Sequence, residues 1–303
     1  MRIKVAFALL GLVADSLGGA RATAAPATPI EQASWPSLKK QVELPNGMRL
    51  AYVEAGNPNG EPLLLLHGYT DTSRSWSLLV PHLSEYRLLI PDQRGHGASG
   101  APECCYTIAD FAYDARLFLD ALGVKRAAVA GHSMGSMVAM AMAAEYPDRV
   151  SAIALLGSSG LVPATRGAWL FDNATGQRFP IDRNSQFMRD WDPANQPTPI
   201  DAAFAAAARE EIYAIPPQVW RGVLRELTGV LVARHSADVK ARVLVLSGGK
   251  DPLFPAEHHD ALLKAFPGAK ARVYPGLGHN FLWEQPAAVA ADLDRFLKAS
   301  RGN

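Results

Sequence analysis

The sequence predicts an α/β protein built on a doubly wound, mostly parallel sheet. Short, continuous apolar runs recur along its 303 residues, and segments with helical spacing lie between them. Apolar runs without polar alternation are typical of parallel strands that helices cover on both faces. The alternation of the two kinds of segment indicates that helices connect successive strands.

The predicted strands follow from these runs. Residues 49–54 alternate between polar and apolar side chains, as a half-buried strand does, and residues 271–274 are also strand-like. The continuous apolar runs, which suit central strands, are residues 63–66, 88–90, 127–130, 153–156 and 243–246.

The helices of the same unit are predicted from the spacing of their apolar residues. Pro286 suits the first turn of the last helix, because its fixed φ matches a helix start and its missing amide hydrogen is not needed there. The four predicted helices are residues 108–122, 134–146, 256–266 and 286–299.

Composition excludes two classes of protein. The chain has 49% hydrophobic residues, and its 30 Lys and Arg almost balance 29 Asp and Glu. A disordered chain would have fewer apolar residues, and a polybasic nucleic-acid-binding protein would not be so nearly neutral. The only cysteines are the neighbours Cys104 and Cys105, so we expect neither a disulfide framework nor a structural zinc site.

Residues 1–24 resemble an export signal. Arg2 and Lys4 precede the apolar residues 5–14, and small residues at 22–24 suit cleavage after Ala24. The apolar run is shorter than the about 20 residues that span a bilayer, so we expect export to the periplasm or the medium without stable membrane insertion. A disordered or weakly helical cytosolic N-terminus is the alternative, because Asp15 lies close to the run.

Residues 160–238 interrupt the rhythm of strands and helices. Seven prolines separate short helical pieces, such as 202–212 and 219–233, and no convincing strand is found before residue 243. This segment is predicted to be a helical cap, inserted into a core made of residues 25–159 and 239–303.

A nucleophile is predicted at Ser133. The apolar run 127–130 leads into Gly131-His132-Ser133-Met134-Gly135 and then into a helix. In this strand, turn and helix context, the glycines of Gly-x-Ser-x-Gly allow a sharp turn that exposes the serine hydroxyl above the sheet.

A serine hydroxyl needs an imidazole to accept its proton and a carboxylate to orient that imidazole. Asp251 lies in a loop after the strand 243–246, and His279 follows the strand-like residues 271–274. The three side chains therefore leave the same edge of the sheet, where such folds bind ligands. The loop after residues 153–156 contains no acidic residue, so Asp251 is the candidate acid.

Two backbone amides are candidates for an oxyanion hole. Met134 follows the nucleophile, and Tyr69 follows Gly68, which permits the turn that would direct the Tyr69 amide inward. His67 and His96 lie in glycine-bearing loops and are predicted to shape those loops by hydrogen bonds. His258 and His259 lack partners at metal-ligand spacing, so we predict no metal and no cofactor.

These residues together resemble the α/β-hydrolase superfamily over about residues 40 to 300. The motifs that carry the resemblance are His67-Gly68, residues 92–99, the turn at Ser133, Asp251 and His279, in that order. The resemblance implies a fold shared by esterases, lactonases, perhydrolases, carbon–carbon bond hydrolases and iminopeptidases. Ser133 stands where dehalogenases and epoxide hydrolases of this superfamily have an aspartate, which argues against those two activities.

The expected substrate is a small, mainly apolar ester or lactone bound between core and cap. No cluster of arginines lies near the motifs, so a polyanion is not expected. A cofactor-free perhydrolase, an iminopeptidase-type hydrolase and a hydrolase-fold binding protein with little turnover are the alternatives. Oligomeric state is not predicted. The residues expected to line the substrate pocket are Trp76, Phe254, Phe281, Trp191 and Trp220.

Overall fold

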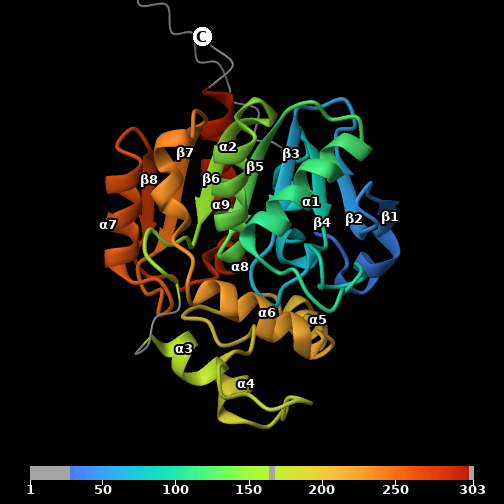
Figure 1. Ribbon diagram of the computed structural model, residues 1–303, viewed down its shortest axis with the longest axis vertical. Coiled ribbons are helices and arrows are strands. Elements are labelled where there is room, and N and C mark those ends of the chain that lie inside the picture. Colours follow the sequence, from blue (N-terminus) through green and yellow to red (C-terminus); the bar gives the residue numbers. More distant parts are fainter. Residues whose placement is uncertain (1–27, 164–167, 300–303) are drawn as a thin grey trace, which may run out of the picture.

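The computed structural model describes residues 28–163 and 168–299, which form one eight-stranded sheet with helices around it (Figure 1). The strand order is β1-β2-β4-β3-β5-β6-β7-β8. The pairs β1–β2 and β2–β4 are antiparallel, and the remaining pairs are parallel. The strands are β1 (Lys40–Glu43), β2 (Arg49–Gly56), β3 (Pro62–Leu66), β4 (Arg87–Pro91), β5 (Ala127–His132), β6 (Val150–Leu156), β7 (Arg242–Gly248) and β8 (Lys270–Tyr274).

Helices cover both faces of this sheet, which confirms the predicted doubly wound α/β class. Side chains of α1 and α2 share one hydrophobic cluster with the strands, and side chains of α8 and α9 share the other. The core helices are α1 (Ile108–Ala121), α2 (Met134–Glu145), α7 (Ala256–Ala265), α8 (Phe281–Glu284) and α9 (Pro286–Lys298).

The run at residues 63–66 shows why the central strands are apolar throughout. Leu64 and Leu66 belong to the cluster with α1 and α2, whereas Leu63 and Leu65 belong to the cluster with α9. Successive strand side chains point to opposite faces, and here both faces are buried. Each leucine stabilises the fold by about 1.5 to 3 kcal/mol relative to an exposed position.

Some elements of the structure differ from the sequence predictions. The edge strand β1 was not predicted, because it contains one apolar residue, Val42, and its other side chains are exposed. The helix predicted over residues 219–233 is wrong in its length. It is α6 (Pro217–Leu227), and the Gly229 amide then donates to the Glu226 carbonyl in a turn before residues 232–238 form a separate 3₁₀ helix.

Between β6 and β7, the described residues form four α-helices, the 3₁₀ helix 232–238 and no strand. In Figure 1 these helices lie together beyond one end of the sheet. We call residues 160–238 the cap. It is linked to the core in part by Arg74, which pairs with Glu211 at 2.8 Å. The cap helices are α3 (Trp169–Ala174), α4 (Gln186–Asp190), α5 (Ala202–Tyr213) and α6.

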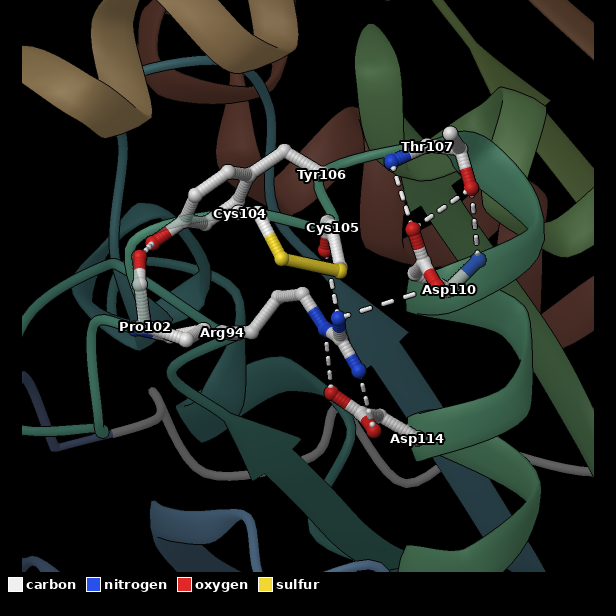
Figure 2. The surroundings of a disulfide bond; sticks show 8 residues. All are labelled: Arg94, Pro102, Cys104, Cys105, Tyr106, Thr107, Asp110 and Asp114. Atoms are coloured by element: carbon white, nitrogen blue, oxygen red, sulfur yellow. Dashed lines mark hydrogen bonds and ion pairs between the residues drawn. A yellow bond between two sulfur atoms is a disulfide. The ribbon is translucent and has the colours of Figure 1, made fainter.

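Cys104 and Cys105 form a disulfide in the loop before α1 (Figure 2). Arg94 donates a hydrogen bond to the Cys105 carbonyl and pairs with Asp114 through two nitrogens at 2.7 Å. Arg94 thus fixes the loops around the disulfide, and the disulfide itself joins two neighbouring residues.

The predicted export signal, residues 1–24, lies outside the described residues. Within residues 28–163 and 168–299, no helix combines the length and apolar character needed to cross a membrane.

Candidate active site

Ser133 lies between the end of β5 and the start of α2, in a backbone conformation with φ 52° and ψ −120°. Positive φ is unfavourable for a residue with a β-carbon and costs about 1 to 3 kcal/mol. The neighbouring glycines make this turn possible. A β-carbon on Gly131 would lie 2.1 Å from the Gly135 carbonyl oxygen, and one on Gly135 would lie 2.2 Å from that of Leu66. The spacing of Gly-x-Ser-x-Gly is therefore a steric requirement of the turn.

His279 and Asp251 are joined by a hydrogen bond at the same edge of the sheet. His279 Nδ1 donates to Asp251 Oδ2 at 2.7 Å. Asp251 Oδ1 accepts from the backbone amides of Leu253 at 2.8 Å and Phe254 at 2.9 Å. Burial by itself raises the pKa of Asp251, but the charge and hydrogen bond of His279 and these two amides together hold it below its ordinary value. Asp251 is therefore an anion at neutral pH.

The proton on Nδ1 leaves Nε2 of a neutral His279 as a bare acceptor. This nitrogen is buried and has no hydrogen-bond partner among the described residues. His279 and Ser133 line the same cavity, which has a volume of about 470 Å³ and is called here the Ser133 cavity. The structure thus brings the predicted Ser133, Asp251 and His279 together at one place.

The two predicted oxyanion donors also line the Ser133 cavity. Met134 is the first residue of α2, where a backbone amide has no partner within the helix. Within the described part of the chain, neither the Met134 amide nor the Tyr69 amide donates a hydrogen bond. The Tyr69 side chain has a separate role, because its hydroxyl donates to the Trp220 carbonyl of the cap at 2.8 Å.

Only two of the five predicted pocket residues, Phe254 and Trp191, line the Ser133 cavity. Trp76 and Phe281 are wrong, because both are fully buried in the cluster that contains α9. Trp220 is also wrong for this cavity. It lies in the cap core and lines a second cavity of about 290 Å³, on whose wall Tyr69 also lies.

Sequence reasoning missed several residues of the cavity wall. Trp169 and Leu170 come from α3, and Trp283 comes from α8. Trp283 lies one turn after His279, and this proximity was the one available signal. Asp71, in the loop after β3, was also missed, and it lines the cavity.

The loop histidines have the structural roles that the sequence predicts. The backbone amide of Gln93 donates to His67 Nε2 at 2.9 Å, and His96 Nδ1 donates to the Arg94 carbonyl at 2.8 Å. Burial lowers the pKa of both rings, that of His96 to about 3, so both are neutral at neutral pH. Across residues 28–163 and 168–299, His, Cys, Asp and Glu form no group of three that could hold a metal ion.

Comparison with known proteins agrees with this fold. The family described as the alpha/beta hydrolase fold matches residues 61–286. Lipase 1 of Psychrobacter immobilis is 30% identical over 256 residues, which cover 79% of this chain and 78% of the lipase.

Two solved structures show the same fold at lower identity. The enol-lactonase of Burkholderia xenovorans LB400 is 23% identical with a TM-score of 0.73, over 86% of this chain and 100% of that one. An esterase of Rhodococcus sp. ECU1013 is also 23% identical with a TM-score of 0.73, over 86% of this chain and 98% of that one.

Proposed function

Because the chain belongs to the α/β-hydrolase family, we propose that it is a serine hydrolase of carboxylic esters or lactones that forms an acyl-enzyme on Ser133. One observation carries the proposal. His279 presents a bare, buried Nε2 beside the cavity that Ser133 lines, while Asp251 holds the proton on Nδ1. The resemblance to a lipase over most of the chain supports an ester as the substrate.

In the first half of the proposed reaction, Ser133 Oγ attacks the ester carbonyl and transfers its proton to His279 Nε2. The carbonyl oxygen becomes an oxyanion, and the amides of Tyr69 and Met134 are the proposed donors to it. Collapse of this intermediate breaks the bond to the leaving alcohol, which takes the proton from His279. The Asp251 carboxylate stabilises the imidazolium that forms between these steps.

In the second half, water attacks the acyl-enzyme and gives its proton to His279 Nε2. The second tetrahedral intermediate then releases the acid, and Ser133 recovers its proton. With a lactone, the alcohol and the acid are two ends of one product molecule. We propose further that residues 1–24 direct the enzyme out of the cytoplasm, so that the reaction takes place in the periplasm or the medium.

The test is covalent labelling of the purified protein with a serine-directed phosphonate, followed by peptide mass spectrometry. We expect a single adduct on Ser133, together with hydrolysis of 4-nitrophenyl acetate that the label abolishes. Ser136 is a matched control because it lies on the same peptide, and Ser136→Ala should still take the label. Hydrolysis by a protein that is labelled elsewhere, or persistent hydrolysis in Ser133→Ala, would refute the proposed nucleophile.

A further inference from the structure

His132 has an unused hydrogen-bond acceptor beside Ser133. Its Nε2 lies 3.1 Å from the carbonyl oxygen of His279, and because a carbonyl only accepts, Nε2 carries the proton. The ring is 1% exposed, and burial lowers the pKa of His132, so it is neutral with a bare Nδ1. This Nδ1 has no hydrogen-bond partner among the described residues.

The carboxylate of Asp71 is a second hydrogen-bond acceptor, and it faces His132 Nδ1. Its Oδ2 lies 3.8 Å from His132 Nδ1, which is too far for a hydrogen bond. Within the described part of the chain, no lysine or arginine pairs with Asp71, although its side chain is only 11% exposed. Two acceptors, one of them a carboxylate, therefore face each other without a donor between them. A positively charged N–H donor placed between them would supply a hydrogen bond to the pair and compensate the charge of the carboxylate.

This acceptor pair lies next to the proposed nucleophile and not in a remote part of the cavity. A β-carbon added to Gly68 would lie 2.8 Å from Asp71 Oδ2, 3.3 Å from His132 Nδ1 and 3.2 Å from Ser133 Cβ. Asp71, His132 and Ser133 all line the Ser133 cavity. A molecule bound at Ser133 therefore lies against the two residues that carry the acceptors.

The rest of the cavity wall suits a cation. Five aromatic residues line it, and a cation over an aromatic face is stabilised by the quadrupole of the ring. Among the described residues of the wall the one lysine, Lys250, is exposed, and Asp192 on the cap side is already paired with Arg209. The aromatic residues are Tyr69, Trp169, Trp191, Phe254 and Trp283.

We propose that Asp71 and His132 form a subsite for a protonated amine of the substrate, so that the enzyme prefers esters with an amino group. This inference rests on the proposed function and replaces the expectation of a mainly apolar substrate. A protonated amine donates an N–H to this acceptor pair and neutralises Asp71. An uncharged ester leaves that carboxylate uncompensated beside Ser133, where it opposes the negative charge of the oxyanion.

The decisive experiment compares two esters of the same shape at neutral pH. The two are 2-(dimethylamino)ethyl acetate, whose protonated nitrogen carries one N–H, and 3-methylbutyl acetate, which has a C–H in its place. We expect kcat/KM of the wild-type enzyme to favour the amino ester by roughly ten- to a hundredfold, the scale of hydrogen bonds to charged groups. The readout is the ratio of the two values, which a general loss of activity does not change.

Asp71→Asn should bring this ratio close to one. Asp190→Asn is the matched control, because Asp190 is an exposed carboxylate on the cap side of the same cavity, and this variant should keep the preference. An equal ratio in wild type and Asp71→Asn would overturn the proposal. Loss of the preference in Asp190→Asn to the same extent would also overturn it, because the effect would then be the net charge of the cavity.

A second ester pair tests the donor itself. Acetylcholine and 3,3-dimethylbutyl acetate differ in charge, and neither has an N–H at that position. If kcat/KM favours the charged ester more strongly in the dimethylamino pair than in the acetylcholine pair, the result supports the acceptor pair. An equal ratio in both pairs would overturn it in favour of cation binding by the aromatic rings alone. If 3-methylbutyl acetate is hydrolysed and Ser133 takes the phosphonate, but no ratio depends on Asp71, the subsite alone fails. If no ester is hydrolysed and Ser133 takes no label, the proposed function fails.

Discussion

Replacing Asp251 with Asn is expected to slow turnover by holding His279 in the wrong tautomer. In the wild type, Oδ1 accepts from the amides of Leu253 and Phe254, and Oδ2 accepts from His279 Nδ1. Asparagine has one oxygen, which will face the two amides, because an –NH₂ group there would set donors against donors. The –NH₂ group then faces Nδ1. This nitrogen must accept, and the proton of His279 moves to Nε2.

An Nε2 that carries a proton does not accept the one from Ser133. For a triad with the wrong tautomer, the turnover number falls by roughly three to four powers of ten, which corresponds to about 4 to 5.5 kcal/mol of transition-state stabilisation. The fold should persist, because both backbone amides around residue 251 keep an acceptor. The loss should therefore appear in kcat and not in the circular dichroism spectrum.

Steady-state hydrolysis of 4-nitrophenyl acetate measures this effect. Asp260→Asn is the matched control, because Asp260 is an exposed carboxylate on α7 and should have no influence on kcat. A fall of less than tenfold in Asp251→Asn, with the fold intact, would refute the reasoning and place the acid elsewhere.

Three other perturbations test the wall of the Ser133 cavity, the disulfide and the buried His96. Trp191→Ala removes a ring that lines the cavity, so the kcat/KM ratio between long and short acyl 4-nitrophenyl esters should shift by roughly 1 to 3 kcal/mol. An unchanged ratio would show that the Trp191 ring does not contact the acyl chain. Serine at both Cys104 and Cys105 should lower the melting temperature only slightly, because a disulfide between neighbours closes almost no chain, and a large calorimetric drop would contradict this. Burial lowers the pKa of His96 from 6.5 to about 3, so between these values the unfolded chain binds a proton that the native chain does not, and stability falls as pH falls. His96→Asn keeps a donor for the Arg94 carbonyl and should flatten the dependence of the unfolding free energy on pH across this window, measured by denaturant titration; the same slope in both proteins would show that another group is responsible.

The sequence predicted those parts of the site that depend on local backbone requirements. Gly131 and Gly135 are needed wherever a strand turns sharply into a helix, so Ser133 was recognisable from its neighbours. Trp76 and Phe281 were misplaced because proximity to a motif along the chain does not fix the face of the sheet to which a side chain turns. Both are in the cluster with α9.

Asp71 was missed for a related reason. It lies two residues after Tyr69, and its position beside Ser133 depends on a loop in which Thr70 has φ 63° and Gly68 lies against the nucleophile. Neither the backbone angle of Thr70 nor the bare Nδ1 of His132 has a sequence signature. Asp71 can be identified as a candidate for substrate binding only after the tautomer of His132 has been derived from its contact with the His279 carbonyl.

The contacts around Ser133 indicate that the cap adds a determinant of substrate preference that is separate from the turn that holds Ser133. Elements of the core hold Ser133, because its amide donates to the Leu156 carbonyl at 2.9 Å and Gly135 packs against β3. The opposite wall belongs to the cap, where Trp191 Nε1 donates to Thr70 Oγ1 at 2.9 Å. A substitution in this wall changes the contacts of the substrate and leaves the nucleophile in place, so it should alter kcat/KM differently for different esters. A side chain at Gly135 would push the turn itself away from β3 and should lower kcat/KM for every ester alike.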